Sequence, residues 1–197
     1  MIKNAALRLF RTAGYERTTT KQIAQAAGVA EGTVFLVAPT KEGLLVTVLE
    51  EQLRAVAGPP LASIPARGIA AQIRHLCSPL FDYFATDPAL SRALLKGMTF
   101  PSDPIARTRR DAHVADFLRA LGGLFERAKA RGELGSRVDP MTCAHNVFAI
   151  YVDAVSAFVT ADAPDRAALG DGFAARLDAL LRGALVGARS VRTRTSR

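Results

Sequence analysis

The segment from Thr19 to Val37 constrains the fold of this chain most, because it places the signals for two short helices and a tight turn within 19 residues. Thr19 opens a capping box, and Gly28 ends the first predicted helix. A second short helix is predicted from about Ala30 to Val37. Two helices that cross at roughly 90–120° need a small residue at the crossing, here Ala24, and a glycine at the turn. The spacing therefore predicts a helix-turn-helix, whose second helix can lie in the major groove of DNA, although an ordinary helical corner has the same spacing.

Helical periodicity extends over the rest of the chain, and no segment alternates with the period of two that a half-buried strand requires. One helix is predicted before Gly14, and a long one over 41–57. Three later helices share one start signal, an Asp N-cap followed by a Pro at the first helical position: Asp87-Pro88, Asp103-Pro104 and Asp139-Pro140. We therefore predict an all-α fold of about nine helices.

A change of composition at Gly58-Pro59-Pro60 and Pro65 indicates a boundary between two parts of the chain. We expect a three-helix DNA-binding domain over 1–45, with the helix 41–57 linking it to the rest of the chain. A helical bundle for ligand binding and dimerisation is predicted over 46–188, and an Arg-rich disordered tail over 189–197.

The formal net charge of +8 is unevenly distributed. Residues 1–57 hold seven basic and five acidic side chains, a net of +2, whereas the last nine residues add four arginines and no acid. This distribution favours nucleic-acid binding only weakly and equally fits a solvated tail.

The compartment is predicted from two absences. No apolar run approaches the eighteen or more residues that cross a bilayer, and the N-terminus lacks the apolar stretch of a signal peptide. The two cysteines, Cys77 and Cys143, have no metal or redox spacing, so we expect buried, reduced thiols. The sequence predicts a cytoplasmic protein without a membrane partner.

The motifs of residues 2 to about 50 form a specific pattern. They are Ala6-Leu7-Arg8-Leu9-Phe10, Gly14-Tyr15, Thr19, Ile23-Ala24, Ala27-Gly28-Val29, Gly32-Thr33-Val34-Phe35 and Pro39-Thr40-Lys41-Glu42-Gly43-Leu44. This pattern resembles the tetracycline-repressor (TetR) family of bacterial regulators. The resemblance implies a homodimer that binds a double-stranded DNA operator and a small-molecule effector, usually as a repressor that the effector releases.

Carried over by position, the resemblance also implies which residues face DNA. They are Thr19, Lys21, Glu31, Thr33, Phe35 and Lys41. Thr19 would cap the second helix, Lys21 and Lys41 would contact phosphates, and Thr33 with its neighbours would face base edges. Phe35 stands where the family usually has a tyrosine that packs on the sugar.

The end of the second short helix departs from the family. Leu36, Val37 and Ala38 stand where polar, basic or aromatic residues are common, and Phe35 lacks a hydroxyl. Each missing donor costs a hydrogen bond of about 1 kcal/mol. An alternative hypothesis is therefore a diverged family member that binds a small molecule or a protein and holds DNA weakly or not at all.

Large apolar residues on the central helices are the candidates for a pocket that takes a mostly apolar ligand: Phe81, Phe84, Met98, Phe100, Phe117, Leu121, Phe148 and Tyr151. His113 and His145 are candidate polar groups beside them. The last two long helices are the candidate dimer helices, and the residues suited to close packing there are Ala154, Phe158, Leu177, Leu180 and Leu181.

An α-helical enzyme is the hypothesis from another class. The three histidines are predicted on separate helices, with no H-x₃-H or E-x-x-H pair, and the chain has no Gly-rich phosphate loop or G-x-S-x-G motif. We therefore expect no catalytic site, no metal and no cofactor.

Overall fold

The computed structural model describes residues 1–101 and 103–189, with side chains as far as Arg182. These residues form nine α-helices and no strand, which confirms the predicted all-α fold. The helices are α1 (Ile2–Thr12), α2 (Thr20–Ala27), α3 (Glu31–Phe35), α4 (Lys41–Ala62), α5 (Ile69–Thr86), α6 (Pro88–Thr99), α7 (Pro104–Ala130), α8 (Pro140–Thr160) and α9 (Arg166–Arg189). The predicted tail 189–197 lies outside the described residues, apart from Arg189 at the end of α9.

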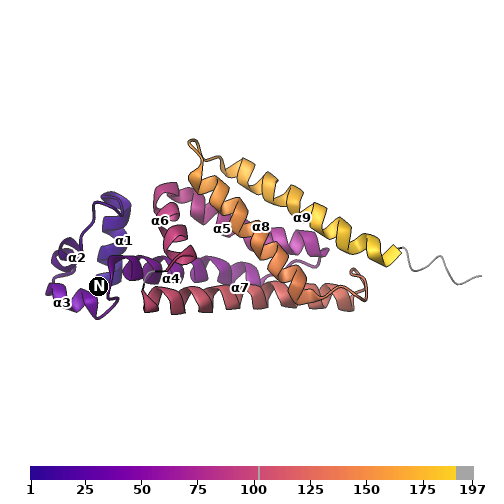
Figure 1. The fold of residues 1–197 in the computed structure, drawn as a ribbon, viewed down its shortest axis with the longest axis horizontal. Helices are drawn as coiled ribbons and strands as arrows, with labels where there is room; N and C mark the ends of the chain where they lie inside the picture. The colour runs from indigo at the N-terminus through magenta and orange to yellow at the C-terminus, as the bar shows by residue number, and fades with distance from the viewer. Residues whose placement is uncertain (102, 190–197) are drawn as a thin grey trace, which may run out of the picture.

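The helices form a small head and an elongated body (Figure 1). Helices α1–α3 make up the head, and α4 runs from it into the body, where α7 lies beside it. Helix α8 packs on α7, and α9 packs on α8 and α5. Helix α4 is thus the element that joins the two parts.

The three Asp-Pro pairs begin helices as predicted. The carboxylates of Asp87, Asp103 and Asp139 accept hydrogen bonds from the backbone N–H three residues on, at 3.0, 2.7 and 2.7 Å. Each following proline occupies the first helical turn, where its missing N–H costs nothing.

Helix α4 is longer than predicted. It continues through Gly58, Pro59 and Pro60 to Ala62 instead of ending at 57. The two prolines lie in the last turns, where their fixed φ is helical, and the Pro60 side chain is buried. The hydroxyl of Ser63 donates to the Pro59 carbonyl at 2.9 Å and satisfies one of the last carbonyls of the helix.

Helix α8 corrects the expectation that no segment could cross a bilayer. By length and composition it is apolar enough to do so, and it is the one such helix among the described residues. Within the bundle, 44% of its most apolar window is buried. The core helix of a bundle has the same composition, so this property does not distinguish the two.

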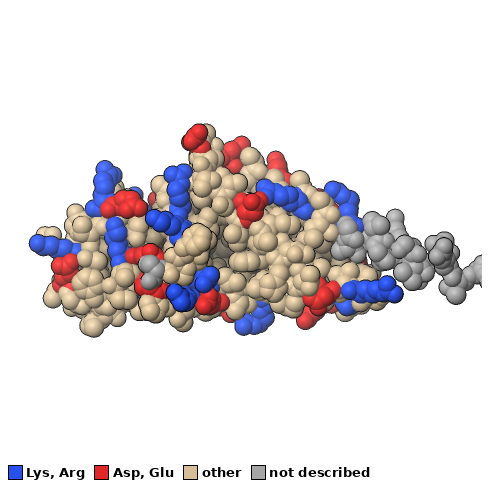
Figure 2. Space-filling model, in the orientation of Figure 1, with Lys and Arg blue, Asp and Glu red and all other residues tan. Residues whose placement is uncertain are grey.

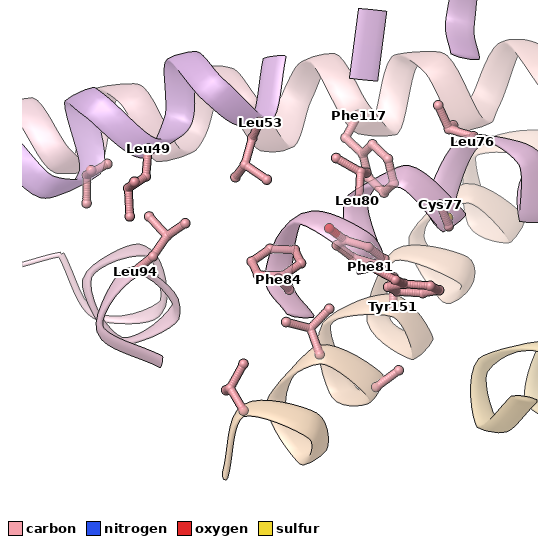
Figure 3. Packing of buried hydrophobic residues seen from close by; sticks show 14 of the residues in the cluster. Leu49, Leu53, Leu76, Cys77, Leu80, Phe81, Phe84, Leu94, Phe117 and Tyr151 are labelled. Atoms are coloured by element: carbon pink, nitrogen blue, oxygen red, sulfur yellow. The ribbon is translucent and has the colours of Figure 1, made fainter. Parts of the chain in front are cut away.

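One continuous hydrophobic core extends from the head into the body, across the predicted boundary at residue 45. Figure 3 shows Leu49 and Leu53 of α4 facing Leu94 of α6, with Phe84 of α5 nearby. Cys77 lies fully buried in this core as a free thiol, and burial raises its pKa; Cys143 is also a buried free thiol.

Candidate nucleic-acid interface and ligand cavity

The helix-turn-helix is held by local hydrogen bonds. The Thr19 hydroxyl accepts from the Gln22 N–H at 3.2 Å, and the Gln22 side chain accepts from the Thr19 N–H at 2.9 Å, a complete capping box. Gly28 ends α2 with φ of 68°, a left-handed conformation that favours glycine. The Ala24 side chain of α2 is buried, and α2 packs against α3. The predicted scaffold is therefore present.

Helix α3 presents one face to the core and another to solvent. Val34 is buried, Thr33 is half-buried and Glu31 is exposed. The Glu31 carboxylate accepts a hydrogen bond from the Thr20 hydroxyl at 2.8 Å, which ties α3 to the first turn of α2. Thr33 thus remains the candidate base contact, while Glu31 also has a role in orienting α3.

The atypical end of α3 divides into two parts. Ala38 is only 1% exposed and Val37 is half-buried, so both belong to the scaffold of the head. Phe35 and Leu36 are 45% and 85% exposed. The departure from the family therefore changes two surface positions, and these present apolar groups to solvent.

Lysine residues of the head have two different environments. Lys21 is exposed at the start of α2. The Lys41 ammonium donates to the carbonyls of Tyr15 and Glu16 at 3.0 and 3.2 Å and lies 4.4 Å from the centroid of the Tyr15 ring. Burial, with the nearby charges of Glu42 and Glu16, raises the pKa of Tyr15 to about 12. Lys41 fastens α4 to the turn after α1, a contact that the sequence did not reveal.

Figure 2 shows Lys and Arg side chains interspersed with Asp and Glu over the visible face of both head and body. No region of one charge sign covers the head in this view. The surface charge therefore agrees with the small net charge of residues 1–57.

The start of α4 is joined to the start of α7 through two helix caps. The Thr40 hydroxyl accepts from the Gly43 N–H at 2.8 Å and donates to the Asp103 carboxylate. Asp103 is buried and caps α7 by accepting from the Ala106 N–H at 2.7 Å. A Cβ at Gly43 would overlap the Asp103 carboxylate, so only glycine permits this approach. These caps therefore connect the chain just after α3 to α7 of the body.

A charge network forms a second connection between head and body. Glu50 on α4 is 2% exposed, and it forms ion pairs with Arg54 and, at 3.3 Å, with Arg109 of α7. The neighbouring Glu51 pairs with Lys3 of α1. A buried carboxylate needs such partners, because removing one leaves an uncompensated charge.

A cavity of about 420 Å³ lies in the body among helices α4 to α8. Its apolar lining residues are Leu53, Phe84, Leu95, Met98, Val114, Ala115, Leu118, Phe148, Val152 and Val155. Its polar lining residues are Thr99, Arg110, Asp111, His113 and Tyr151. The volume lies within the range of roughly 300–1,000 Å³ typical of small-molecule sites.

Four of the eight predicted pocket residues line this cavity: Phe84, Met98, Phe148 and Tyr151. Phe81, Phe117 and Leu121 are buried in the adjoining core and are not among the lining residues. Phe100, the C-cap of α6, is 79% exposed and is not among the lining residues. His145 is also absent from the lining and is exposed on α8.

The polar side of the cavity was only partly found from the sequence. His113 lines it, and burial lowers the pKa of this histidine. Burial raises the pKa of Tyr151 well above its usual value. Arg110 and Asp111 precede His113 on α7 and were missed. Their signal is the helical spacing of Arg110 to Val114 and Leu118, which places all three on one face of α7.

The predicted dimer residues mostly pack inside the protomer. Ala154, Phe158, Leu177 and Leu181 are buried, and Leu180 is half-buried. The four buried residues are therefore covered within the protomer itself. Helices α8 and α9 pack on each other within the protomer. The apolar stripe of each helix therefore faces the core of the protomer itself.

Metal-ligating side chains do not gather in the described parts of the chain. No group of three or more His, Cys, Asp or Glu there could hold a metal ion.

The N-terminal part of the chain is similar to a known family. Residues 2–48 match the profile described as bacterial regulatory proteins, tetR family. No curated protein matches the sequence. Among solved structures, the transcriptional regulator FadR of Bacillus subtilis, in complex with stearoyl-CoA, superposes with a TM-score of 0.69 at 21% identity, over 94% of this chain and 97% of its own.

Two further structures extend the comparison. FadR of Thermus thermophilus, a TetR-family repressor in complex with lauroyl-CoA, has a TM-score of 0.71 at 23% identity and covers 93% of each chain. A putative tetR family transcription regulator from Shewanella sp. PV-4 has a TM-score of 0.60 at 27% identity, over 92% of this chain and 95% of its own. The matched family and these structures are transcription regulators, not enzymes. Residues 2–48 of this chain thus resemble the tetR family of bacterial regulatory proteins, and the described chain is similar in fold to these solved regulators.

Proposed function

We propose that this protein is a ligand-responsive transcription repressor of the cytoplasm, released from its DNA operator by a small, mostly apolar effector. The observation that carries the proposal is the connection of two sites through one helix. The helix-turn-helix leads directly into α4, and Leu53 of α4 lines the cavity. A ligand that contacts Leu53 therefore acts on the element that positions the head.

The effector class is supported by the cavity and by the structural relatives. Ten of the fifteen lining residues are apolar. Two of the similar structures are FadR proteins in complex with stearoyl-CoA and lauroyl-CoA. We propose an effector with an aliphatic chain, which the aromatic and aliphatic walls of the cavity would bury.

The alternative is a diverged regulator that holds DNA weakly, and the exposed Phe35 and Leu36 motivate it. A gel-shift of the full chain against its own upstream intergenic DNA separates the two. The proposal predicts a shift that weakens as salt rises, because phosphate contacts release counterions. No salt-sensitive shift at micromolar protein would favour the alternative.

We also propose a homodimer through the outer faces of α8 and α9. Those faces carry small exposed residues, including Ala149 and Ala157 on α8 and Ala175 and Ala179 on α9, and small side chains allow helices to approach closely. In a two-fold interface each substitution acts twice. Ala157→Glu should therefore yield monomers by light scattering, whereas Ala130→Glu, at the exposed end of α7, should leave the dimer intact.

A further inference from the structure

We infer that the cavity selects an amphipathic anion: an aliphatic acyl chain whose anionic oxygen atoms are held by Arg110. This inference rests on the proposed function, since it names the chemistry of the effector at that site. Its basis is two polar groups that line the cavity and whose hydrogen-bonding capacity the described protein leaves unused, the Tyr151 hydroxyl and the Arg110 guanidinium.

Tyr151 is the first of these groups. Its ring packs among Phe81, Phe117 and Phe148, and it lines the cavity. Among the described residues, no hydrogen bond engages its hydroxyl. A buried tyrosine hydroxyl usually has a partner, because the lost hydration is otherwise uncompensated. A ligand oxygen in the cavity would supply that partner.

Arg110 is the second group and the only cation among the lining residues described. Its Nε is buried and makes no hydrogen bond of good geometry, although Asp111 Oδ1 lies 2.7 Å away. Its two Nη atoms have no hydrogen-bond partner in the described chain. A guanidinium presents its donors as a planar fork that matches a carboxylate or phosphate.

The remaining polar groups agree with an anionic head placed there. Thr99 ends α6 and adds a hydroxyl to the lining, while Arg110 lies in the second turn of α7. His113 lies one helical turn further along α7. The rest of the lining is aromatic and aliphatic and includes Phe84, Phe148 and Val155. The cavity thus combines hydrogen-bonding groups with apolar walls.

Asp111 provides a test that separates an anion-binding role of Arg110 from a purely structural one. Its carboxylate forms an ion pair with Arg110, and its side chain is 62% exposed. A bound anion would share Arg110 with this like charge, so Asp111 lowers the affinity for an anion and has little effect on a neutral ligand. Asp111→Asn should therefore tighten the binding of an anionic ligand.

Isothermal titration of the full chain with decanoate, 1-decanol and decylamine tests the inference. Decanoate should bind at least tenfold more tightly than the other two. Arg110→Gln should remove this preference, Arg110→Lys should retain most of it, and Asp111→Asn should strengthen decanoate binding severalfold. Arg119→Gln is the matched control, because Arg119 lies on the same helix, is 74% exposed and pairs with Asp116 at 2.7 Å.

Decanoyl-CoA distinguishes two sources of the anionic oxygen atoms, the phosphates of a CoA ester and a free carboxylate. If it binds more tightly than decanoate and loses that affinity in Arg110→Gln, the bound oxygens belong to the phosphates of the CoA ester. If decanoate binds more tightly and loses that affinity in Arg110→Gln, they belong to a free carboxylate. Both outcomes support an anion at Arg110.

Equal binding of decanol and decanoate, or an equal loss of all ligands in a folded Arg110→Gln protein, would overturn the inference. Thermal melts of each variant show whether it is folded. Absence of binding by every ligand would also overturn it. The gel-shift on the same protein reports separately whether the DNA-binding part of the proposed function stands.

Discussion

The head and the body place polar and apolar groups in opposite ways. In the head, the surface that would face DNA exposes Phe35 and Leu36, while Lys41 is turned inward to backbone carbonyls. In the body, the polar residues Thr99, Arg110, Asp111, His113 and Tyr151 line a mostly apolar cavity. A surface with few charges gains little affinity from phosphates and depends more on contacts with the bases. A cavity with unpartnered polar groups depends on its ligand to satisfy them.

The junction between head and body should be the most sensitive position in the molecule. In Gly43→Ala, the new Cβ would overlap the buried Asp103 carboxylate, and overpacking of this kind lowers the free energy of unfolding by about 2 kcal/mol. Gly32→Ala on α3 is the control, because no atom of a more distant residue lies within 4 Å of its Cβ position and no proline follows it. Alanine there should stabilise the helix by up to about 1 kcal/mol. Chemical denaturation measures both, and equal effects would show that the contact with Asp103 is unimportant.

Phosphate binding by the head should depend on Lys21 more than on Lys41. Lys21→Ala should weaken binding to all DNA sequences about tenfold and reduce the salt dependence of the affinity by about one unit of slope per head. Lys41→Ala removes the contacts to Tyr15 and Glu16, so its larger effect should be on the melting temperature. Fluorescence anisotropy at several salt concentrations makes the comparison. A larger change of salt slope for Lys41→Ala would reverse these roles.

Sequence discrimination should depend on Thr33. Thr33→Ala removes the half-buried hydroxyl of α3 and should change the ratio of affinities for two operators a few-fold, with a smaller change in their mean. The measurement is competition between a selected operator and single-base variants. A uniform loss over all variants would mean that Thr33 contacts the backbone instead.

The smallest effect concerns pH and belongs to the body. Burial lowers the pKa of His113 below the unfolded value of 6.5, so the unfolded chain takes up a proton at a pH where the folded chain does not. Stability should therefore fall as the pH drops from about 7 through 6.5 and towards the lower folded pKa. His113→Asn should make the fall in melting temperature between about pH 7.5 and 5.5 shallower. The exposed His145→Asn is the control and should leave the fall unchanged.

These differences also explain which features were predictable. Thr19, Gly28 and the Asp-Pro pairs act on residues a few positions away, so their spacing predicted the helices and the turn. The link from Thr40 to Asp103 joins residues 63 positions apart, and nothing local to either residue indicates it. The cavity is formed by five helices, so the sequence identified Phe84 and Tyr151 but could not separate them from the core residues Phe81 and Phe117. The sequence likewise could not separate the predicted dimer residues from residues that are buried within the protomer.

The central claim is that ligand in the cavity changes how the head holds DNA. Its most direct test is fluorescence anisotropy of an operator, selected from the protein's upstream DNA, with the full chain and increasing decanoyl-CoA or decanoate. We expect salt-sensitive binding that saturating ligand weakens at least tenfold, and no such release in Arg110→Gln. Binding that stays unchanged while calorimetry shows the cavity to be filled would contradict the claim.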